Sequence, residues 1–138
     1  MISAAVMCLA LNLYFEARSE SLAGQLAVGF STMNRVNDQH YPDDVCSVVK
    51  QAKYNGYSEY PIRHKCQYSW FCDGMSDKPT DNKAMSEAII LASNIYSGKV
   101  TDISNGATHY HATWIEAPSW AYKMTKVVTI DKHIFYRY

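Results

Sequence analysis

The sequence predicts an α+β fold that is mainly helical and has a small antiparallel β region in its C-terminal third. Apolar residues recur at helical spacing in the first half and again between 84 and 95. By contrast, 127–130 and 134–138 are short β-branched and aromatic runs on either side of Asp131-Lys132, as in a hairpin. With 138 residues and 48% hydrophobic content, we expect one domain over residues 1–138.

Helices are expected along most of the chain before residue 52. Ser19 or Ser21 can cap a second helix that runs to about Asn37. Pro42 suits the first position of a third, short helix that ends near Gln51. The first helix carries a stripe at spacings of three or four, which puts six residues on one face: Ile2, Val6, Leu9, Leu13, Glu16 and Glu20.

The segment 52–79 shows no helical period and is interrupted by glycines and prolines, so we expect a long loop rich in aromatic residues. A loop of this length in a compact domain is usually functional. Thr80 is the expected cap of a further helix that ends before Gly98.

Four cysteines are too few for a disulfide scaffold in a chain of this length. Cys8 is expected in the core. Cys66 and Cys72 bracket an aromatic segment and can pair with each other or with Cys46, and the sequence does not choose between these pairings.

Charge and hydropathy argue against two classes of partner. Lys and Arg number 13, as do Asp and Glu, so no strong field draws the chain toward nucleic acid or an anionic membrane. The apolar segment 1–13 is too short to span a bilayer and continues into a charged helix. We therefore expect no membrane insertion, no signal peptide, synthesis in the cytoplasm, and a monomer.

Glu16 is the main catalytic candidate because it stands where the apolar stripe predicts a buried side chain, directly after Tyr14 and Phe15. Burial disfavours the charged carboxylate and raises its pKa, which suits a general acid at neutral pH. The alternative is a carboxylate at a helix end paired with Arg18.

Glycoside cleavage often uses two carboxylates. Glu20, Asp73 and Asp77 are candidates for a second one, and none stands out. The eleven tyrosines, with three tryptophans and four phenylalanines, offer flat rings that suit sugar faces, although such rings also fill cores.

The run from Leu11 to Glu20, which contains Glu16-Ala17-Arg18-Ser19-Glu20, resembles the Glu-Ala-Arg-Gly-Glu motif of the SleB-like cell wall hydrolases, the spore cortex-lytic family. Further motifs similar to the family follow in order: Asn34-Arg35-Val36, Tyr41-Pro42-Asp43-Asp44, Cys66-Gln67-Tyr68-Ser69-Trp70, Gly106-Ala107-Thr108-His109-Tyr110-His111, Pro118-Ser119-Trp120 and His133-Ile134-Phe135-Tyr136-Arg137. Ser19 and Asp131 depart from the pattern, since glycine is usual at both positions. If that glycine has a positive φ in relatives, Ser19 would be strained.

The resemblance implies a lysozyme-like α+β fold and one catalytic domain over 1–138. It implies cleavage of peptidoglycan between N-acetylmuramic acid and N-acetylglucosamine by lytic transglycosylation to a 1,6-anhydro product, with Glu16 as acid and then base and no second carboxylate required. The expected substrate-binding residues are Gln67, Tyr68, Ser69, His109, Tyr110 and Tyr136. No metal and no cofactor is expected. A domain without a leader indicates a phage endolysin that acts on the host wall.

Three alternatives remain open. Water in place of the sugar hydroxyl would make the protein a hydrolytic N-acetylmuramidase. A noncatalytic glycan-binding module would account for the aromatic residues without Glu16. Finally, His109 and His111 alternate on a predicted strand and, with His133 or Cys66, would form the zinc site of an amidase or peptidase.

Overall fold

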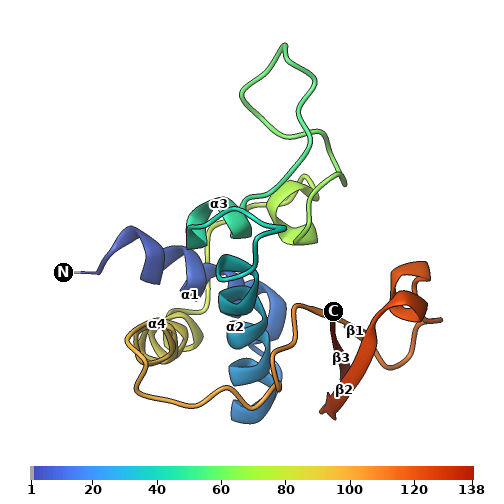
Figure 1. The fold of residues 1–138 in the computed structure, drawn as a ribbon. Helices are drawn as coiled ribbons and strands as arrows, with labels where there is room; N and C mark the ends of the chain where they lie inside the picture. The colour runs from blue at the N-terminus through green and yellow to red at the C-terminus, as the bar shows by residue number, and fades with distance from the viewer. Residues whose placement is uncertain (1) are drawn as a thin grey trace.

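The computed structural model describes residues 2–138 and places a group of helices beside a small sheet (Figure 1). The helices are α1 (Ala4–Ala17), α2 (Leu22–Val36), α3 (Val45–Val49) and α4 (Asn82–Tyr96), with two 3-10 helices, η1 (Ser69–Cys72) and η2 (Ser119–Lys123). The strands are β1 (His109–Ala112), β2 (Thr125–Ile130) and β3 (His133–Arg137). The predicted mainly helical α+β fold with a C-terminal antiparallel sheet is confirmed.

The α1 helix is the centre of the core because it packs against α2, α3 and α4. Leu9 and Leu13 are fully buried, as the stripe predicts, and Phe135 from β3 joins the same core. Residues outside the stripe, such as Asn12 and Tyr14, are buried as well. A helix with neighbours on several sides buries more than one face, so a single stripe underestimates its burial.

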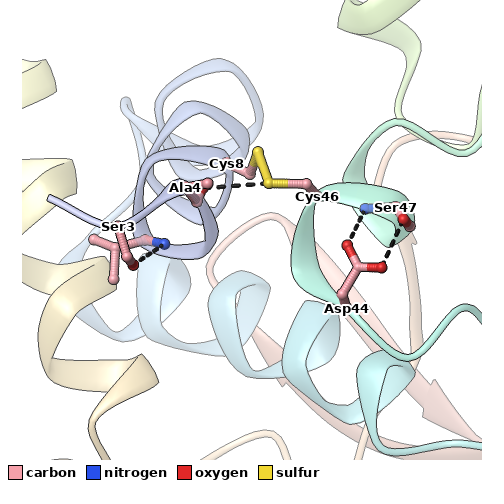
Figure 2. Close-up of a disulfide and its surroundings, with 7 residues drawn as sticks. Ser3, Ala4, Cys8, Asp44, Cys46 and Ser47 are labelled. Atoms are coloured by element: carbon pink, nitrogen blue, oxygen red, sulfur yellow. Dashed lines mark hydrogen bonds between the residues drawn. A yellow bond between two sulfur atoms is a disulfide. The ribbon is translucent and has the colours of Figure 1, made fainter.

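Acidic and hydroxyl side chains set the helix starts. Ser21 caps α2 through the N–H of Gly24. The third helix does not begin at Pro42, because Asp44 is its cap and accepts the N–H of Ser47 at 2.9 Å (Figure 2). Likewise Asp81, rather than Thr80, caps α4. In each case the side-chain oxygen accepts a backbone N–H that the first helical turn leaves free.

The sheet has the strand order β1-β3-β2 with antiparallel pairs throughout. The predicted hairpin is confirmed, and its turn residue Asp131 has φ +51°. Asp tolerates this left-handed conformation better than most residues. Within residues 2–138 Ser19 is not among the non-glycine residues with positive φ, so the strain considered for Ser19 does not arise.

Both disulfides in the described part of the chain join segments near helices. Cys8 is buried, as expected, but it is bonded to Cys46 and so links α1 to α3 (Figure 2). The sequence does not indicate this pair, because the packing of α1 on α3 is what brings the two Cα atoms to 5.2 Å. Cys66 pairs with Cys72, one of the two options left open.

The long loop projects from the helices at the top of Figure 1. Its base is closed by a β-bridge between Ala52 and Cys66, and it exposes Tyr54, Tyr57 and Tyr60. Among residues 2–138, none of the helices is long and apolar enough to cross a bilayer.

Candidate active site

Glu16 lies at the C-terminal end of α1, the end that faces the sheet, and its side chain is only partly exposed. Its carboxylate Oε1 accepts a hydrogen bond from the Tyr110 hydroxyl of β1. Burial raises the pKa of Glu16 above its usual value, while the Tyr110 hydrogen bond and the charge of Arg35 act in the opposite direction. Burial dominates, so the site favours the protonated acid more than water does.

The Arg35 side chain is the cation behind the carboxylate. It projects from α2, is buried, and donates from Nε to the Thr108 carbonyl at 2.6 Å. Its guanidinium carbon lies 5.2 Å from the ring centre of Tyr41 and 5.1 Å from that of Tyr68. These contacts hold a positive charge beside β1 and near Glu16.

A buried polar network runs from α1 to the aromatic loop. Asn12 accepts from the indole nitrogen of Trp70 at 2.8 Å and donates to Thr32 at 3.2 Å. The Thr32 hydroxyl in turn lies 3.0 Å from the hydroxyl of Tyr68. Trp70 also stacks on Phe15, the residue before Glu16. The network therefore fixes the loop against the helix that carries the carboxylate.

Glu20 lies just beyond the end of α1, and its Oε1 is 3.4 Å from Nδ1 of His133. The His133 ring meets the Tyr110 ring edge-on at 5.0 Å. His133 and Tyr110 thus lie on the face of the sheet that is turned toward Glu16.

His109, His111 and Tyr136 lie on the opposite face of the sheet from Tyr110, because side chains alternate along a strand. His111 Nε2 is 2.9 Å from the Tyr136 hydroxyl, and the His109 ring packs against Trp120. Burial lowers the pKa of His109 to about 4. The predicted roles of His109 and Tyr136 in substrate binding stay predictions, and they require a substrate that reaches this face.

The remaining predicted residues flank the network. Tyr68 is buried, whereas its neighbours Gln67 and Ser69 are exposed. Of the six predicted substrate-binding residues, Tyr110 and Tyr68 lie near Glu16: burial, and then the Glu16 charge, raises the pKa of both hydroxyls.

The residues suggested for zinc do not converge. Cys66 is bonded to Cys72, and His133 faces the other side of the sheet from His109 and His111. Across residues 2–138, no group of three His, Cys, Asp or Glu side chains is close enough to hold a metal ion. The donor set that a zinc amidase requires is therefore not assembled by these histidines.

A family model described as Cell Wall Hydrolase matches residues 19–136, which is most of the chain. The chain belongs to the cell wall hydrolase family. The matched range begins at residue 19, beyond Glu16, so the identification does not depend on the candidate acid. The family acts on the bacterial cell wall.

Two curated relatives of this cell wall hydrolase are spore cortex-lytic enzymes. The one from Halalkalibacterium halodurans is 28% identical over 133 residues and the one from Oceanobacillus iheyensis 27% identical over 130 residues, each alignment covering 94% of this chain. The chain spans only 34% and 40% of the lengths of these relatives.

Two solved structures share the fold of this cell wall hydrolase. The catalytic domain of the germination-specific lytic transglycosylase SleB from Bacillus anthracis has a TM-score of 0.70 at 23% identity, with 98% of this chain and 96% of that chain covered. The catalytic domain of the Bacillus cereus SleB protein has a TM-score of 0.58 at 22% identity, covering 99% and 93%. The expected lysozyme-like α+β fold is thereby confirmed.

The sequence does not indicate the places of Arg35, which lies near Glu16, and of His133, which contacts Glu20 and Tyr110 and was considered only as a zinc ligand. Arg35 occupies a buried position of α2, in helical register with the buried Val28 and Thr32. A cation in an apolar stripe is the same signal that identified Glu16. No comparable local signal marks His133, whose contact with Glu20 depends on how the hairpin docks on the helices.

Proposed function

We propose that this cell wall hydrolase cleaves the glycan strand of peptidoglycan between N-acetylmuramic acid and N-acetylglucosamine by lytic transglycosylation, with residues 1–138 forming one catalytic domain. Glu16 is the general acid and then the general base. The observation that carries the proposal is the half-buried Glu16 carboxyl, with a raised pKa and the Tyr110 hydroxyl on one oxygen. The relatives named as cortex-lytic enzymes and as a lytic transglycosylase support the same reaction.

In the first step Glu16 donates its proton to the glycosidic oxygen as the bond from that oxygen to C1 of the muramic residue breaks. Tyr110 donates to Oε1, so the proton of the acid form is carried by Oε2. Burial keeps this proton in place until the leaving oxygen needs it. The muramic residue is left with oxocarbenium character.

In the second step the C6 hydroxyl of the muramic residue bonds to C1, and its proton passes to the ionised Glu16. The product is a 1,6-anhydro ring, and the acid form of Glu16 is restored. Tyr110 and Arg35 both stabilise the ionised carboxylate between the two steps.

The substrate contacts in this proposal come from the loop and β1. Gln67 and Ser69 are exposed on either side of Tyr68 and are suited to hydrogen bonding with sugar hydroxyl and acetamido groups. Tyr110 lies beside the reacting bond. The role of a phage endolysin stays a prediction from the sequence.

The test is mass spectrometry of the fragments that purified peptidoglycan releases with the wild type and with Glu16→Gln. Muropeptides that end in 1,6-anhydro-muramic acid, absent with the variant, are the expected result. Reducing-end muramic acid would replace the transglycosylase with a muramidase. Intact glycan strands with wild-type protein bound to them would identify a glycan-binding module and overturn the proposal.

A further inference from the structure

Glu20 and His133 form a partly buried pair that the proposed reaction does not use. Their side chains are 11% and 12% exposed, and Oε1 lies 3.4 Å from Nδ1. This separation is within ion-pair range but longer than a good hydrogen bond, and Nδ1 has no hydrogen-bond partner among the described residues. A buried ring nitrogen without a hydrogen bond requires an explanation, and the Glu20 carboxylate 3.4 Å away is the group that faces it.

The pair continues directly into the candidate active site. The His133 ring meets the Tyr110 ring edge-on, with centres 5.0 Å apart, and the Tyr110 hydroxyl donates to Glu16. Phe135 packs on the Tyr110 ring as well, at 5.4 Å. Glu16 and Glu20, at the end of α1, are thus connected through the Tyr110 ring of β1 and the His133 ring of β3.

Hydrogen bonds between the hairpin turn and the α1–α2 junction fix the spacing of this pair. Asp131, in the hairpin turn just before His133, accepts hydrogen bonds from the backbone N–H and the hydroxyl of Ser21, the residue after Glu20. Gly24 makes the approach possible, since a Cβ there would lie 2.5 Å from Asp131 Oδ2 and 2.9 Å from the Glu20 Cβ. The hairpin and the α1–α2 junction are therefore held together where the pair forms.

We propose that Glu20 and His133 are positioning residues, which hold the Tyr110 ring so that its hydroxyl stays on Oε1 of Glu16. This inference rests on the proposed function of Glu16. Burial lowers the pKa of His133, although Glu20 and Asp131 oppose this effect. With the proton of the neutral ring on Nδ1, the contact with the Glu20 carboxylate is an electrostatic one at 3.4 Å rather than a good hydrogen bond. This contact limits rotation of the imidazole, which packs edge-on against the Tyr110 ring.

The experiment compares turnover of purified peptidoglycan over a range of pH for Glu20→Leu, Glu20→Gln and His133→Phe. Leu removes the acceptor and keeps the volume, Gln keeps an acceptor, and Phe keeps the ring but loses the N–H. Asp38→Asn and His40→Phe are the matched controls, because Asp38 and His40 form a similar pair, with the histidine 59% exposed.

We expect Glu20→Leu and His133→Phe to lower kcat about ten-fold with little change in the half-saturating amount of peptidoglycan, since a misplacement of about 1 Å can cost about 100-fold in rate. Glu20→Gln should restore part of the rate, and the controls should match the wild type. Loss of the Tyr110 hydrogen bond removes an effect that lowers the Glu16 pKa. The alkaline limb of the rate profile should therefore move to higher pH.

The alkaline limb reports the pKa of Glu16. Three segments present groups to the Glu16 carboxyl: β1 presents Tyr110, α2 presents Arg35 and the loop presents Tyr68. Tyr110→Phe should shift the limb in the same direction, and Glu20→Leu combined with Tyr110→Phe should be no slower than Tyr110→Phe alone. Losses that multiply in the double variant would overturn the inference.

A wild-type rate and profile for Glu20→Leu would overturn the inference as well, and it would leave the proposed function intact if Glu16→Gln is inactive. An active Glu16→Gln would instead remove the proposed function. Circular dichroism checks that each variant folds, and the comparison of Glu20→Leu with Glu20→Gln carries the test if His133→Phe does not fold.

Discussion

Opposing effects act on the pKa of Glu16, and together they suit a carboxyl group that first donates a proton and then accepts one. Burial disfavours its charge, whereas Tyr110 and Arg35 stabilise the charge once it forms. A carboxylate with neither influence would be ionised at neutral pH, and one with burial alone would be a poor base. The same balance makes Glu16 unfavourable for folding at neutral pH, because the folded chain must hold a carboxylate in a poorly solvated position.

Glu16→Gln is expected to raise the thermal stability of the protein at neutral pH. The pKa of Glu16 in the folded protein lies above its unfolded value of 4.5. The contribution of Glu16 to the free energy of unfolding is therefore most favourable below the unfolded pKa, and this stability is lost as the pH rises through the folded pKa. Gln does not titrate, so the gap in Tm between the variant and the wild type should widen with pH over that interval. Thermal melts across the acid and neutral range measure the gap. A constant gap, or a less stable variant at neutral pH, would contradict the pKa direction.

The two disulfides act on different elements. Cys8–Cys46 joins α1 to α3 with a sequence separation of 38, whereas Cys66–Cys72 closes a short segment with a separation of 6. The short segment contains Tyr68 and Trp70, which belong to the buried network beside Glu16. The long link is thus mainly a constraint on the unfolded chain, and the short link holds residues of the site.

Replacing each pair by serine should therefore separate stability from activity. From loop-closure entropy we expect Cys8→Ser with Cys46→Ser to cost about 4 kcal/mol and Cys66→Ser with Cys72→Ser about 2 kcal/mol. Activity on peptidoglycan at a temperature where both variants are folded should fall more for the short link. Denaturant unfolding and muropeptide release measure the two effects. A larger loss of activity on removal of Cys8–Cys46 would show that Tyr68 keeps its place without the Cys66–Cys72 bond.

Gly24 decides whether the hairpin can dock on α2. Gly24→Ala would favour the helix itself by about 1 kcal/mol. Its Cβ, however, would lie 2.5 Å from Asp131 Oδ2 and 2.9 Å from the Glu20 Cβ. We expect a net loss of stability and of turnover, with Ala23→Gly as the control that changes helix propensity alone at an exposed neighbouring position. A stabilised Gly24→Ala variant would show that Asp131 moves aside at little cost.

Local structure can be predicted from this sequence more fully than the pairings between distant elements. The apolar stripes and the Asp131-Lys132 turn predict the helices, the hairpin and the position of Glu16, because helix and strand periods are properties of neighbouring residues. The helix starts are less well predicted. Pro42 suits a first helical position, but α3 begins after the cap Asp44. Thr80 and Asp81 can both accept the free N–H groups of α4, and Asp81 is the cap.

The docking of the sheet on the helices lay beyond local patterns. Tyr110 was predicted in the site through the family resemblance, but His109 was expected beside it, and strand alternation places the two on opposite faces. The bond between Cys8 and Cys46 and the contact of Glu20 with His133 likewise join residues that are neighbours only in the folded chain.

Helices and sheet should unfold together, since the bonds that join them are buried or half-buried. Asn34 donates to the Ala107 carbonyl at 2.9 Å and Arg35 to that of Thr108 at 2.6 Å, while Phe135 shares the core of α1. We therefore expect residues 1–138, purified with both disulfides intact, to be a monomer with one unfolding transition by circular dichroism and by tryptophan fluorescence. Separate midpoints would mean that the sheet is an independent unit. Glu16 and Tyr110 would then part before the helices unfold, and activity would be lost at the lower midpoint.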